Sequence, residues 1–260
     1  MTVFVGCAGW GLPREVWPEF PMGDSHLRRY SGRLPAVEVN SSFYHPHRPE
    51  TYARWAASVP PEFRFAVKMP MTITHERWLV GVERELVAFF DQVAALGDRL
   101  GCVLLQLPPS LAFDRSEAGA FFALLRSRYA GPVACEPRHP SWFEEEVELL
   151  LDDARVAGVA ADPAPVPEGR VPRGWPGLVY YRLHGSPVRY YSPYADDALD
   201  ALADHVEASD RSGIPTWCIF DNTALGAAPR NALDLEARLR DPERGSEDGE
   251  MALNQEGDPL

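Results

Sequence analysis

The sequence lacks features that mark several common classes of protein. No stretch approaches the roughly 20 consecutive apolar residues of a membrane-spanning helix, and the first residues enter an apolar run without the basic segment of a secretory signal. No cluster of lysine and arginine occurs, and the formal net charge is −13. Such a chain repels a phosphate backbone. We therefore expect a cytoplasmic protein with no membrane partner and no nucleic-acid partner.

Cofactor and metal motifs are also missing. No Gly-x-Gly-x-x-Gly follows the first apolar run, no P-loop occurs, and no His-x-His or His-Glu-x-x-His spacing is present. The four cysteines lie far apart in apolar runs, without a Cys-x-x-Cys pair, as is typical of buried free thiols. Cys7, beside Gly6 near a strand end, is the one whose reactivity is worth testing. No cofactor is evident, and a divalent metal stays an open alternative.

Short β-branched runs alternate with amphipathic helical stretches, a pattern typical of repeated βα units. Strands are expected at residues 3–7, 36–40, 63–68, 102–107, 132–136, 158–162, 178–184 and 216–221. Helices are expected at residues 25–34, 49–58, 83–100, 116–129, 141–156, 195–212 and 231–240. Pro49 suits a first helical turn, and Ser141 with Glu144 matches a capping box. Eight parallel strands predict a single (β/α)8 TIM-like barrel.

Two segments depart from a regular barrel. Residues 163–177 carry five prolines and three glycines where a sixth helix should follow its strand, so we expect a loop and an irregular sixth βα unit. Residues 241–260 contain seven acids and one arginine with little periodic hydrophobicity. We interpret residues 1–240 as the barrel domain and residues 241–260 as a disordered acidic tail, with an acidic interaction tail as the alternative.

Polar side chains gather where the predicted strands end, which is the end of a parallel barrel that carries catalytic groups. Because side chains alternate along a strand, Glu38 shares a face with Asn40, Glu136 with Arg138, and Arg182 with His184. The expected mouth of the barrel also receives Lys68, Gln106, Asp162, Asp221 and Asn222. A network of salt bridges without function is the alternative reading of any one of these residues.

The residue types suggest roles. Glu38, Glu136, His184 and His75 are candidates for proton transfer, and the same four side chains have the chemistry of a divalent metal site although they come singly from separate strands. Lys68, Arg138 and Arg182 are candidates to bind a phosphate or carboxylate. Aromatic residues follow strands one, two, five and seven and are candidates to roof the mouth or to pack its loops. They include Trp10, Trp17, Phe43, Tyr44, Trp142, Tyr190, Tyr191 and Tyr194.

These residues fall in motifs that resemble the YecE-like proteins, domain-of-unknown-function family 72. The motifs lie at residues 6–10, 37–44, 65–68, 73–75, 105–109, 136–142, 182–185, 221–222 and 231–232. The resemblance implies an irregular TIM-like barrel and no established reaction. Its recurring polar positions match Glu38, Asn40, Lys68, His75, Gln106, Glu136, Arg138, His139, Arg182, His184 and Asn222. The chain departs from the family pattern at residues 11–13 and at Asp221, where asparagine is commoner.

We therefore predict an enzyme that acts on a small anionic or polar substrate, such as a phosphorylated sugar or a nucleotide-like molecule, by acid/base hydrolysis or isomerisation. Its candidate catalytic residues are Glu38, Glu136, His184 and His75. Its candidate substrate-binding residues are Asn40, Lys68, Gln106, Arg138, His139, Arg182, Asp221, Asn222, Trp10 and Tyr44. A noncatalytic barrel that senses a metabolite and a metal-dependent phosphodiesterase or nuclease are the two alternatives.

Overall fold

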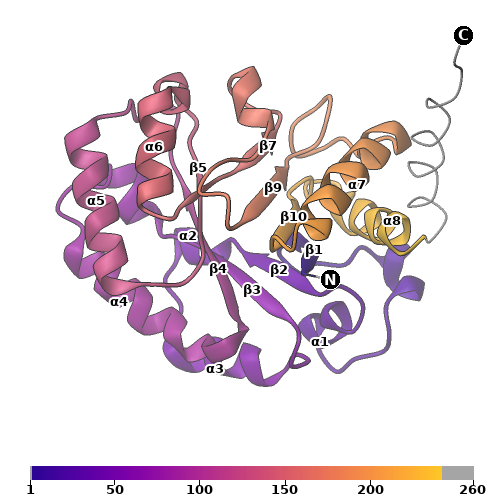
Figure 1. Ribbon diagram of the computed structural model, residues 1–260. Helices are drawn as coiled ribbons and strands as arrows, with labels where there is room; N and C mark the ends of the chain where they lie inside the picture. Colours follow the sequence, from indigo (N-terminus) through magenta and orange to yellow (C-terminus); the bar gives the residue numbers. More distant parts are fainter. Residues whose placement is uncertain (1, 242–260) are drawn as a thin grey trace, which may run out of the picture.

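The strands close into a nearly complete parallel barrel in the computed structural model, which describes residues 2–241. Figure 1 shows the sheet with its helices around it. The strands run in the order β7-β9-β10-β1-β2-β3-β4-β5-β6-β8. They are β1 (Val3–Ala8), β2 (Ala36–Val39), β3 (Arg64–Lys68), β4 (Leu100–Gln106), β5 (Val133–Glu136), β6 (Ala157–Gly158), β7 (Ala160–Asp162), β8 (Arg173–Gly174), β9 (Val179–Leu183) and β10 (Thr216–Phe220). The predicted α/β barrel is confirmed.

The sixth strand of the barrel is split in two at Val159. Its first half, β6, pairs with β5, and its second half, β7, pairs with β9. The Val159 amide still donates to the Cys135 carbonyl at 2.8 Å, so this broken strand links the two ends of the sheet. The short β8 then pairs antiparallel with β6. No α-helix lies between β7 and β9, which confirms the predicted irregularity.

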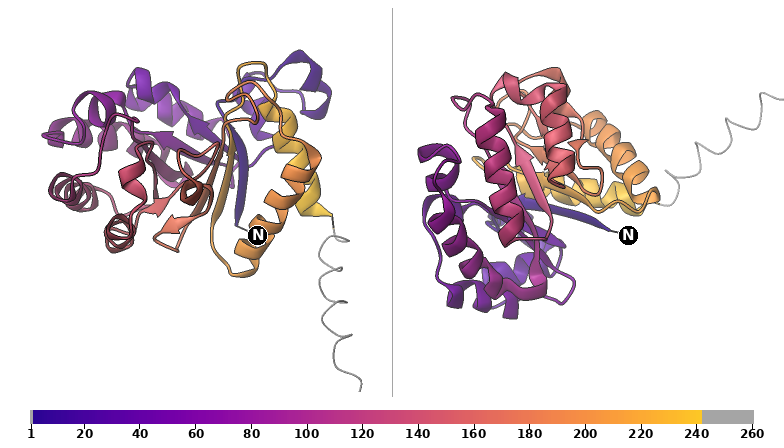
Figure 2. Two further views of the ribbon diagram at one scale, coloured as in Figure 1. Left: turned by 90° about the horizontal axis from the view of Figure 1, so that it is seen from above. Right: turned by 60° about the vertical axis from the view of Figure 1, so that its left-hand side comes forward.

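Helices cover the outside of the barrel, with α3 to α6 on one side and α7 and α8 on the other (Figures 1 and 2). They are α1 (His26–Ser31), α2 (Ser41–Tyr44), α3 (Pro49–Ala57), α4 (Glu83–Val93), α5 (Arg115–Arg128), α6 (Glu145–Asp153), α7 (Asp196–Arg211) and α8 (Ala228–Arg240). Shorter turns of helix are η1 (Arg14–Glu19), η2 (Thr72–Glu76), η3 (Ala94–Arg99), η4 (Pro140–Phe143) and η5 (Pro167–Arg170).

Sequence signals for helix starts agree with the structure at α3 but not at α6. Pro49 lies in the first turn of α3, where its missing N–H removes no helical bond. The predicted capping box at Ser141 and Glu144 is wrong, because α6 begins after Glu144 and no side chain caps it. The Ser141 hydroxyl instead accepts from the Phe113 amide at 2.8 Å. Ser141 therefore ties η4 to the segment before α5.

Alanines, a few aliphatic side chains and two aromatic rings fill the interior of the barrel. The inner cluster contains Ala36, Ala66, Cys102, Leu104, Ala134, Ala157, Val159, Ala161, Leu178, Tyr180, Trp217 and Ile219. The Tyr180 and Trp217 rings stack there with centroids 5.9 Å apart. Because alternate residues point inward, the next inward position beyond this layer is polar on several strands. That polar layer lines the mouth. We call the part of it around Arg182 the floor, and we call Lys68 and the loop that carries Arg189 the rim.

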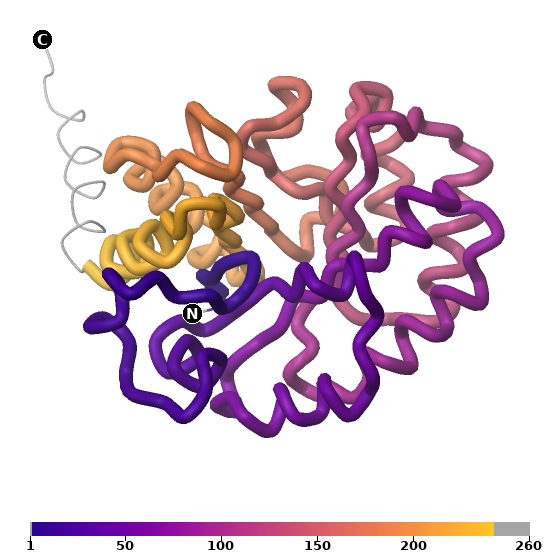
Figure 3. The backbone as a smooth tube through the Cα atoms, turned by 180° about the vertical axis from the view of Figure 1, so that it is seen from behind, coloured from indigo at the N-terminus to yellow at the C-terminus, as the bar shows by residue number. Residues whose placement is uncertain are grey.

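The two ends of the described chain meet on one side of the barrel. Figure 3 shows α8 beside the first residues of the chain, and Arg230 of α8 pairs with Glu19 of η1 at 2.9 Å. Within residues 2–241, no helix has both the length and the apolar character needed to cross a membrane. The predicted disordered tail at residues 241–260 lies, apart from Asp241, outside the described residues.

Candidate active site

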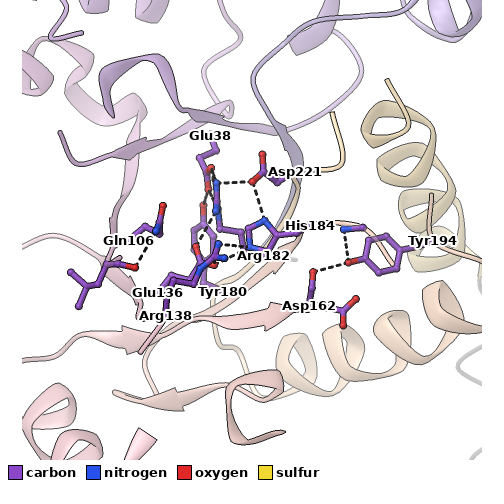
Figure 4. Close-up of polar contacts among 12 residues, drawn as sticks. Glu38, Gln106, Glu136, Arg138, Asp162, Tyr180, Arg182, His184, Tyr194 and Asp221 are labelled. Carbon is purple, nitrogen blue, oxygen red and sulfur yellow. Dashed lines mark hydrogen bonds and ion pairs between the residues drawn. The ribbon is translucent and has the colours of Figure 1, made fainter. Parts of the chain in front are cut away.

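Arg182 lies at the centre of the floor, surrounded by three carboxylates (Figure 4). Its Nη2 is 2.7 Å from Glu38 Oε1 and 3.1 Å from Asp221 Oδ2, and its Nη1 is 2.9 Å from Glu136 Oε2. Its Nε lies 3.1 Å from Glu38 Oε2. The side chain is 2% exposed. Arg182 therefore offers no exposed donor to a substrate and organises the acids instead.

The electrostatics of the floor follow from this enclosure. Burial alone would lower the pKa of Arg182, but Glu38, Asp221 and Glu136 outweigh it and raise that pKa well above its usual value. Burial alone would raise the pKa of Glu136, but the charges of Arg182, His184 and Arg138 hold it well below its usual range. Tyr180 donates to Glu38 Oε2 at 2.8 Å. Glu136 is therefore ionised, and these contacts fix the floor acids in place.

His184 bridges two of the acids. Its Nδ1 lies 3.0 Å from Asp221 Oδ2, and its Nε2 lies 2.9 Å from Glu136 Oε1. The pKa of Asp221 is lowered because the charges of Arg182 and His184 and the His184 hydrogen bond outweigh the effect of burial. The imidazole is fully buried, with the Tyr190 ring edge-on to it at a centroid distance of 5.6 Å.

Arg138 completes a triangle of polar atoms with His184 and Glu136. Its Nη2 lies 2.6 Å from Glu136 Oε1 and 3.0 Å from His184 Nε2. The pairing of Glu136 with Arg138 on one face agrees with their alternation in the sequence, as does the pairing of Arg182 with His184. The triangle therefore offers His184 Nε2 both a donor, from Arg138, and an acceptor, from Glu136.

Lys68 differs from the floor residues because no carboxylate of the described chain pairs with its ammonium group. Among residues 2–241, no hydrogen bond or ion pair reaches Lys68 Nζ. It lies 4.0 Å from the Phe43 ring centroid, and the residue is 8% exposed. Burial and the charge of Arg182 lower the pKa of Lys68 to about 8, although Glu38, Glu136 and Asp221 act in the opposite direction.

His75 lies on the single π-helical turn η2, an element frequent at functional sites. Its ring packs edge-on against Phe43 at 4.8 Å, and its Nδ1 is 2.8 Å from the Thr74 hydroxyl. Burial and the charges of Lys68 and Arg138 lower the pKa of His75 to about 4. His75 is therefore uncharged at neutral pH and shares the mouth with Lys68 and Arg138.

A pocket of about 370 Å³ opens beside the triangle. Arg138, Arg189, Tyr190 and Gln106 contribute to its wall together with prolines, and its lining contains no acid. The Nε atoms of Arg138 and Arg189 are buried without a hydrogen-bond partner among the described residues. In a protein with a net charge of −13, two guanidinium groups with vacant donors make this wall suitable for an anion.

The loop that carries Arg189 and Tyr190 is anchored from below. Asn222 Nδ2 donates to the Ser192 carbonyl at 3.0 Å and to Asn231 Oδ1 at 2.9 Å. Tyr190 has a φ of 70°, in the left-handed region that costs a non-glycine residue energy. Asn222, predicted to bind substrate, is buried and holds this loop.

The remaining predicted residues lie outside the Arg182 network. Asn40 does not continue the strand, and its Oδ1 is buried without a partner in the described chain. Gln106 donates to the Leu107 carbonyl at 3.1 Å, and His139 Nδ1 accepts from the Ser141 amide. Asp162 lies beside Tyr194 in Figure 4, apart from Arg182, because its neighbour Ala161 takes the inward position.

The two predicted aromatic binding residues lie on the loops that follow β1 and β2. Trp10 is half-buried and packs edge-on against Trp55 at 5.0 Å. Tyr44 is 64% exposed at the end of α2, with its ring against Phe43 at 4.9 Å. Neither residue contacts the Arg182 network through a hydrogen bond in the described chain.

The described residues contain neither a grouped set of metal ligands nor a reactive thiol. Within residues 2–241, no three His, Cys, Asp or Glu side chains are grouped as a metal site requires, and Arg182 occupies the space between the floor acids. All four cysteines are buried and free. Burial raises the pKa of Cys7 to about 12, so its thiol is protonated at neutral pH and not poised to react.

Sequence reasoning missed two members of the site. Tyr180 lies two residues before Arg182, so the alternation that paired Arg182 with His184 also places Tyr180 on the inward face. Arg189 lies in the loop after β9, next to Tyr190, and only its position after a barrel strand marks it. Its Nε is buried without a hydrogen-bond partner in the described chain, and this depends on three-dimensional contacts that the sequence does not specify.

The family assignment comes from a match over residues 4–254 to the family described as protein of unknown function DUF72. This chain belongs to the DUF72 family. It is similar to UPF0759 protein YunF of Bacillus subtilis (strain 168), at 23% identity in a match that covers 90% of this chain and 93% of YunF. It is also similar to UPF0759 protein YecE of Escherichia coli (strain K12), at 30% identity over 65% of this chain and 62% of YecE.

Solved structures of DUF72 family proteins agree with the fold. The protein of Thermotoga maritima MSB8 superposes with a TM-score of 0.74 at 27% identity, over 93% of this chain and all of that one. A protein of Enterococcus faecalis V583 superposes with a TM-score of 0.77 at 22% identity, over 91% of this chain and 95% of that one. The resemblance seen in the sequence motifs is thereby confirmed for the family and the barrel.

Proposed function

We propose that the barrel mouth is the active site of an enzyme that binds a small anionic substrate and acts by acid/base chemistry, as a hydrolase or isomerase. The observation that carries this proposal is the triangle of Arg138 Nη2, His184 Nε2 and Glu136 Oε1. It provides a hydrogen-bond partner for each of the two protonation states of His184. A group that takes up and returns a proton needs both.

The two states follow from the contacts of the imidazole. In the neutral ring, Nδ1–H donates to Asp221 and Nε2 accepts from Arg138. In the protonated ring, Nδ1–H still donates to Asp221, while Nε2–H donates to Glu136. Asp221 orients the ring in both states, as a carboxylate does in a catalytic triad. His184 is thus the proposed general base and acid.

The substrate anion belongs at the wall formed by Arg138 and Arg189. Their buried Nε donors lack partners, and the pocket that they line adjoins the triangle through Arg138 itself. The Tyr190 ring packs against His184, and this residue is 40% exposed, so the proposal requires the ring to turn aside when substrate binds. A phosphorylated sugar or a nucleotide-like molecule has the required anion, and pockets of this size accept such ligands.

The roles of two predicted residues change in this proposal. Glu38 was a candidate acid or base and Arg182 a candidate anion ligand, yet each satisfies the other inside the barrel. We assign both to positioning Glu136 and Asp221. The metal-dependent alternative has no ligand group in the described chain and is not proposed. A noncatalytic sensor uses the same anion pocket but predicts binding without turnover.

Turnover tests the proposal directly. The full chain is incubated with phosphorylated sugars and nucleotides, and conversion is followed by ³¹P and ¹H nuclear magnetic resonance. We expect conversion of at least one compound, reduced about 10²- to 10⁴-fold in His184→Gln. Arg84→Ala, on the exposed side of α4, should convert it at the wild-type rate.

Two outcomes would overturn the proposal. Compounds that bind without conversion would establish the sensor alternative instead. Conversion at the wild-type rate by His184→Gln would show that His184 is not the general base or acid, even if the mouth still bound the substrate.

A further inference from the structure

Lys68 is the only lysine of this chain, whose other 24 basic side chains are arginines. Resting on the proposed function, we propose that Lys68 is a nucleophilic amine that forms an imine with the carbonyl carbon of the substrate. The substrate class is then a small aldehyde, ketone or 2-oxo acid that carries an oxyanion.

The composition of the chain argues for an amine at this position. Wherever this protein needs a positive charge for an ion pair or for solubility, it uses arginine. Arginine stays protonated and has no free lone pair, whereas lysine can lose its proton and attack a carbon atom. A single lysine among 24 arginines, placed in the barrel mouth, indicates a task that a guanidinium group cannot perform.

The surroundings of Lys68 agree with that task. β3 ends at Lys68, and its inward neighbour Ala66 belongs to the barrel interior, so the alternation along β3 turns Lys68 into the mouth. Its Nζ faces the Phe43 ring and has no acid within ion-pair distance in the described chain. A paired lysine would be held in its ammonium form by the acid.

The charged groups around Lys68 come from several elements. Arg182 of β9 opposes its protonation, while Glu38 of β2, Glu136 of β5 and Asp221 after β10 favour it. Burial has the largest effect, and the pKa of Lys68 is about 8. At neutral pH roughly a tenth of the amine is therefore in the reactive neutral form.

Side chains of the mouth can supply the proton that imine formation at Lys68 requires. Neutral Nζ bonds to the carbonyl carbon while its proton moves to the carbonyl oxygen, which gives a carbinolamine. That hydroxyl takes one further proton from His184, the proposed general acid, and leaves as water, so that a protonated imine remains. The oxyanion of the substrate would lie at Arg138 and Arg189, which orient the carbonyl toward Lys68. The positive imine then acts as an electron sink for the acid/base chemistry.

Borohydride trapping of the full chain tests this inference. The probes are pyruvate, glyoxylate, dihydroxyacetone phosphate and glyceraldehyde 3-phosphate, each incubated with the protein before sodium borohydride is added. We expect the intact mass to rise by the probe mass less one oxygen atom for at least one probe, and peptide mapping to place the adduct at Lys68. Lys68→Arg is the matched control, since it keeps the charge and removes the amine; adducts at the terminal amine appear in both proteins.

The possible results separate this inference from the proposed function. Absence of a Lys68 adduct with all four probes overturns the imine. If Lys68→Arg also converts substrate at the wild-type rate, the acid/base site stands without it. Acetylation by acetic anhydride at several pH values gives a second measurement that needs no substrate. Half-maximal reactivity of Lys68 near pH 8 is expected, and reactivity like that of a free surface lysine overturns the inference.

Discussion

The floor and the rim of the barrel mouth contain the same kinds of side chain and use them differently. On the floor, Arg182 contacts three carboxylates and is 2% exposed. On the rim, Lys68 has no ion pair, and Arg189 keeps a buried Nε without a partner in the described chain. Charge alone therefore does not mark a binding residue. A cation whose donors are vacant is available to a ligand, and one whose donors are all used is not.

Arg138 and His184 connect the two layers. Arg138 contributes Nη2 to the triangle with Glu136, yet its Nε faces no partner and its side chain lines the pocket. His184 is buried but touches Arg138 on one side and Asp221 on the other. The floor therefore fixes the acids and the imidazole, and the rim offers the anion-binding groups.

The largest effect is expected from breaking the floor. Arg182→Met leaves Glu38, Glu136 and Asp221 buried around an apolar side chain, and removing one partner of a buried pair typically costs about 3–5 kcal/mol. We expect the free energy of unfolding in urea to fall by at least that amount, or the chain not to fold. Arg84→Ala serves as the control on exposed surface. A loss below about 1 kcal/mol would show that the floor acids do not depend on Arg182.

The second-largest effect is expected from acid, which should lower the free energy of unfolding by protonating the floor carboxylates. The pKa values of Glu136 and Asp221 are lower in the folded protein than their ordinary values of 4.5 and 3.8. Their contribution to stability is complete above those ordinary values and is lost as the pH falls through the lower folded values. We expect a loss on the order of 3 kcal/mol below pH 4, measured as the free energy of unfolding against pH. Glu136→Gln should show a shallower slope, and an equal slope would contradict the assignment.

Removing the rim cation Lys68 should have a smaller effect on stability than either change to the floor, with the opposite sign. The folded pKa of about 8 lies below the ordinary value of 10.5, so the folded protein binds fewer protons than the unfolded chain between these values. Wild-type stability should therefore rise as the pH increases from 8 to 10.5. Lys68→Met should lack this rise and should be about 1–2 kcal/mol more stable than wild type at pH 7. If Lys68→Met were less stable than wild type, Lys68 would instead stabilise the fold in the way that the floor residues do.

Much of the barrel could be predicted because period-two alternation and turn residues are local signals. The same alternation paired Glu136 with Arg138 and Arg182 with His184, which lie together in the structure. For Asn40 the shared face with Glu38 stays a prediction, because the backbone turns into α2 directly after the strand. The alternation failed for Asp162, where Ala161 takes the inward position. The capping box at Ser141 failed because a distant amide, that of Phe113, occupies the hydroxyl.

The difference between paired and vacant cations could not be predicted. Lys68, Arg138 and Arg182 were grouped as anion ligands because the sequence states charge but not which partners reach each side chain. The three-dimensional contacts separate Arg182 from the other two. They also add Arg189, which comes from a loop with no periodic pattern.

The contrast between floor and rim is tested most directly by titrating the full chain with inorganic phosphate in a calorimeter, for wild type and Arg189→Ala. The predicted result is a dissociation constant at least about tenfold weaker in the variant, because a bidentate guanidinium contact is lost. Its free energy of unfolding should stay within about 1 kcal/mol of wild type, the worth of its contact with the Tyr190 ring. Equal phosphate affinity in the two proteins, or no phosphate binding by wild type, would show that the vacant guanidinium group of Arg189 does not bind an anion.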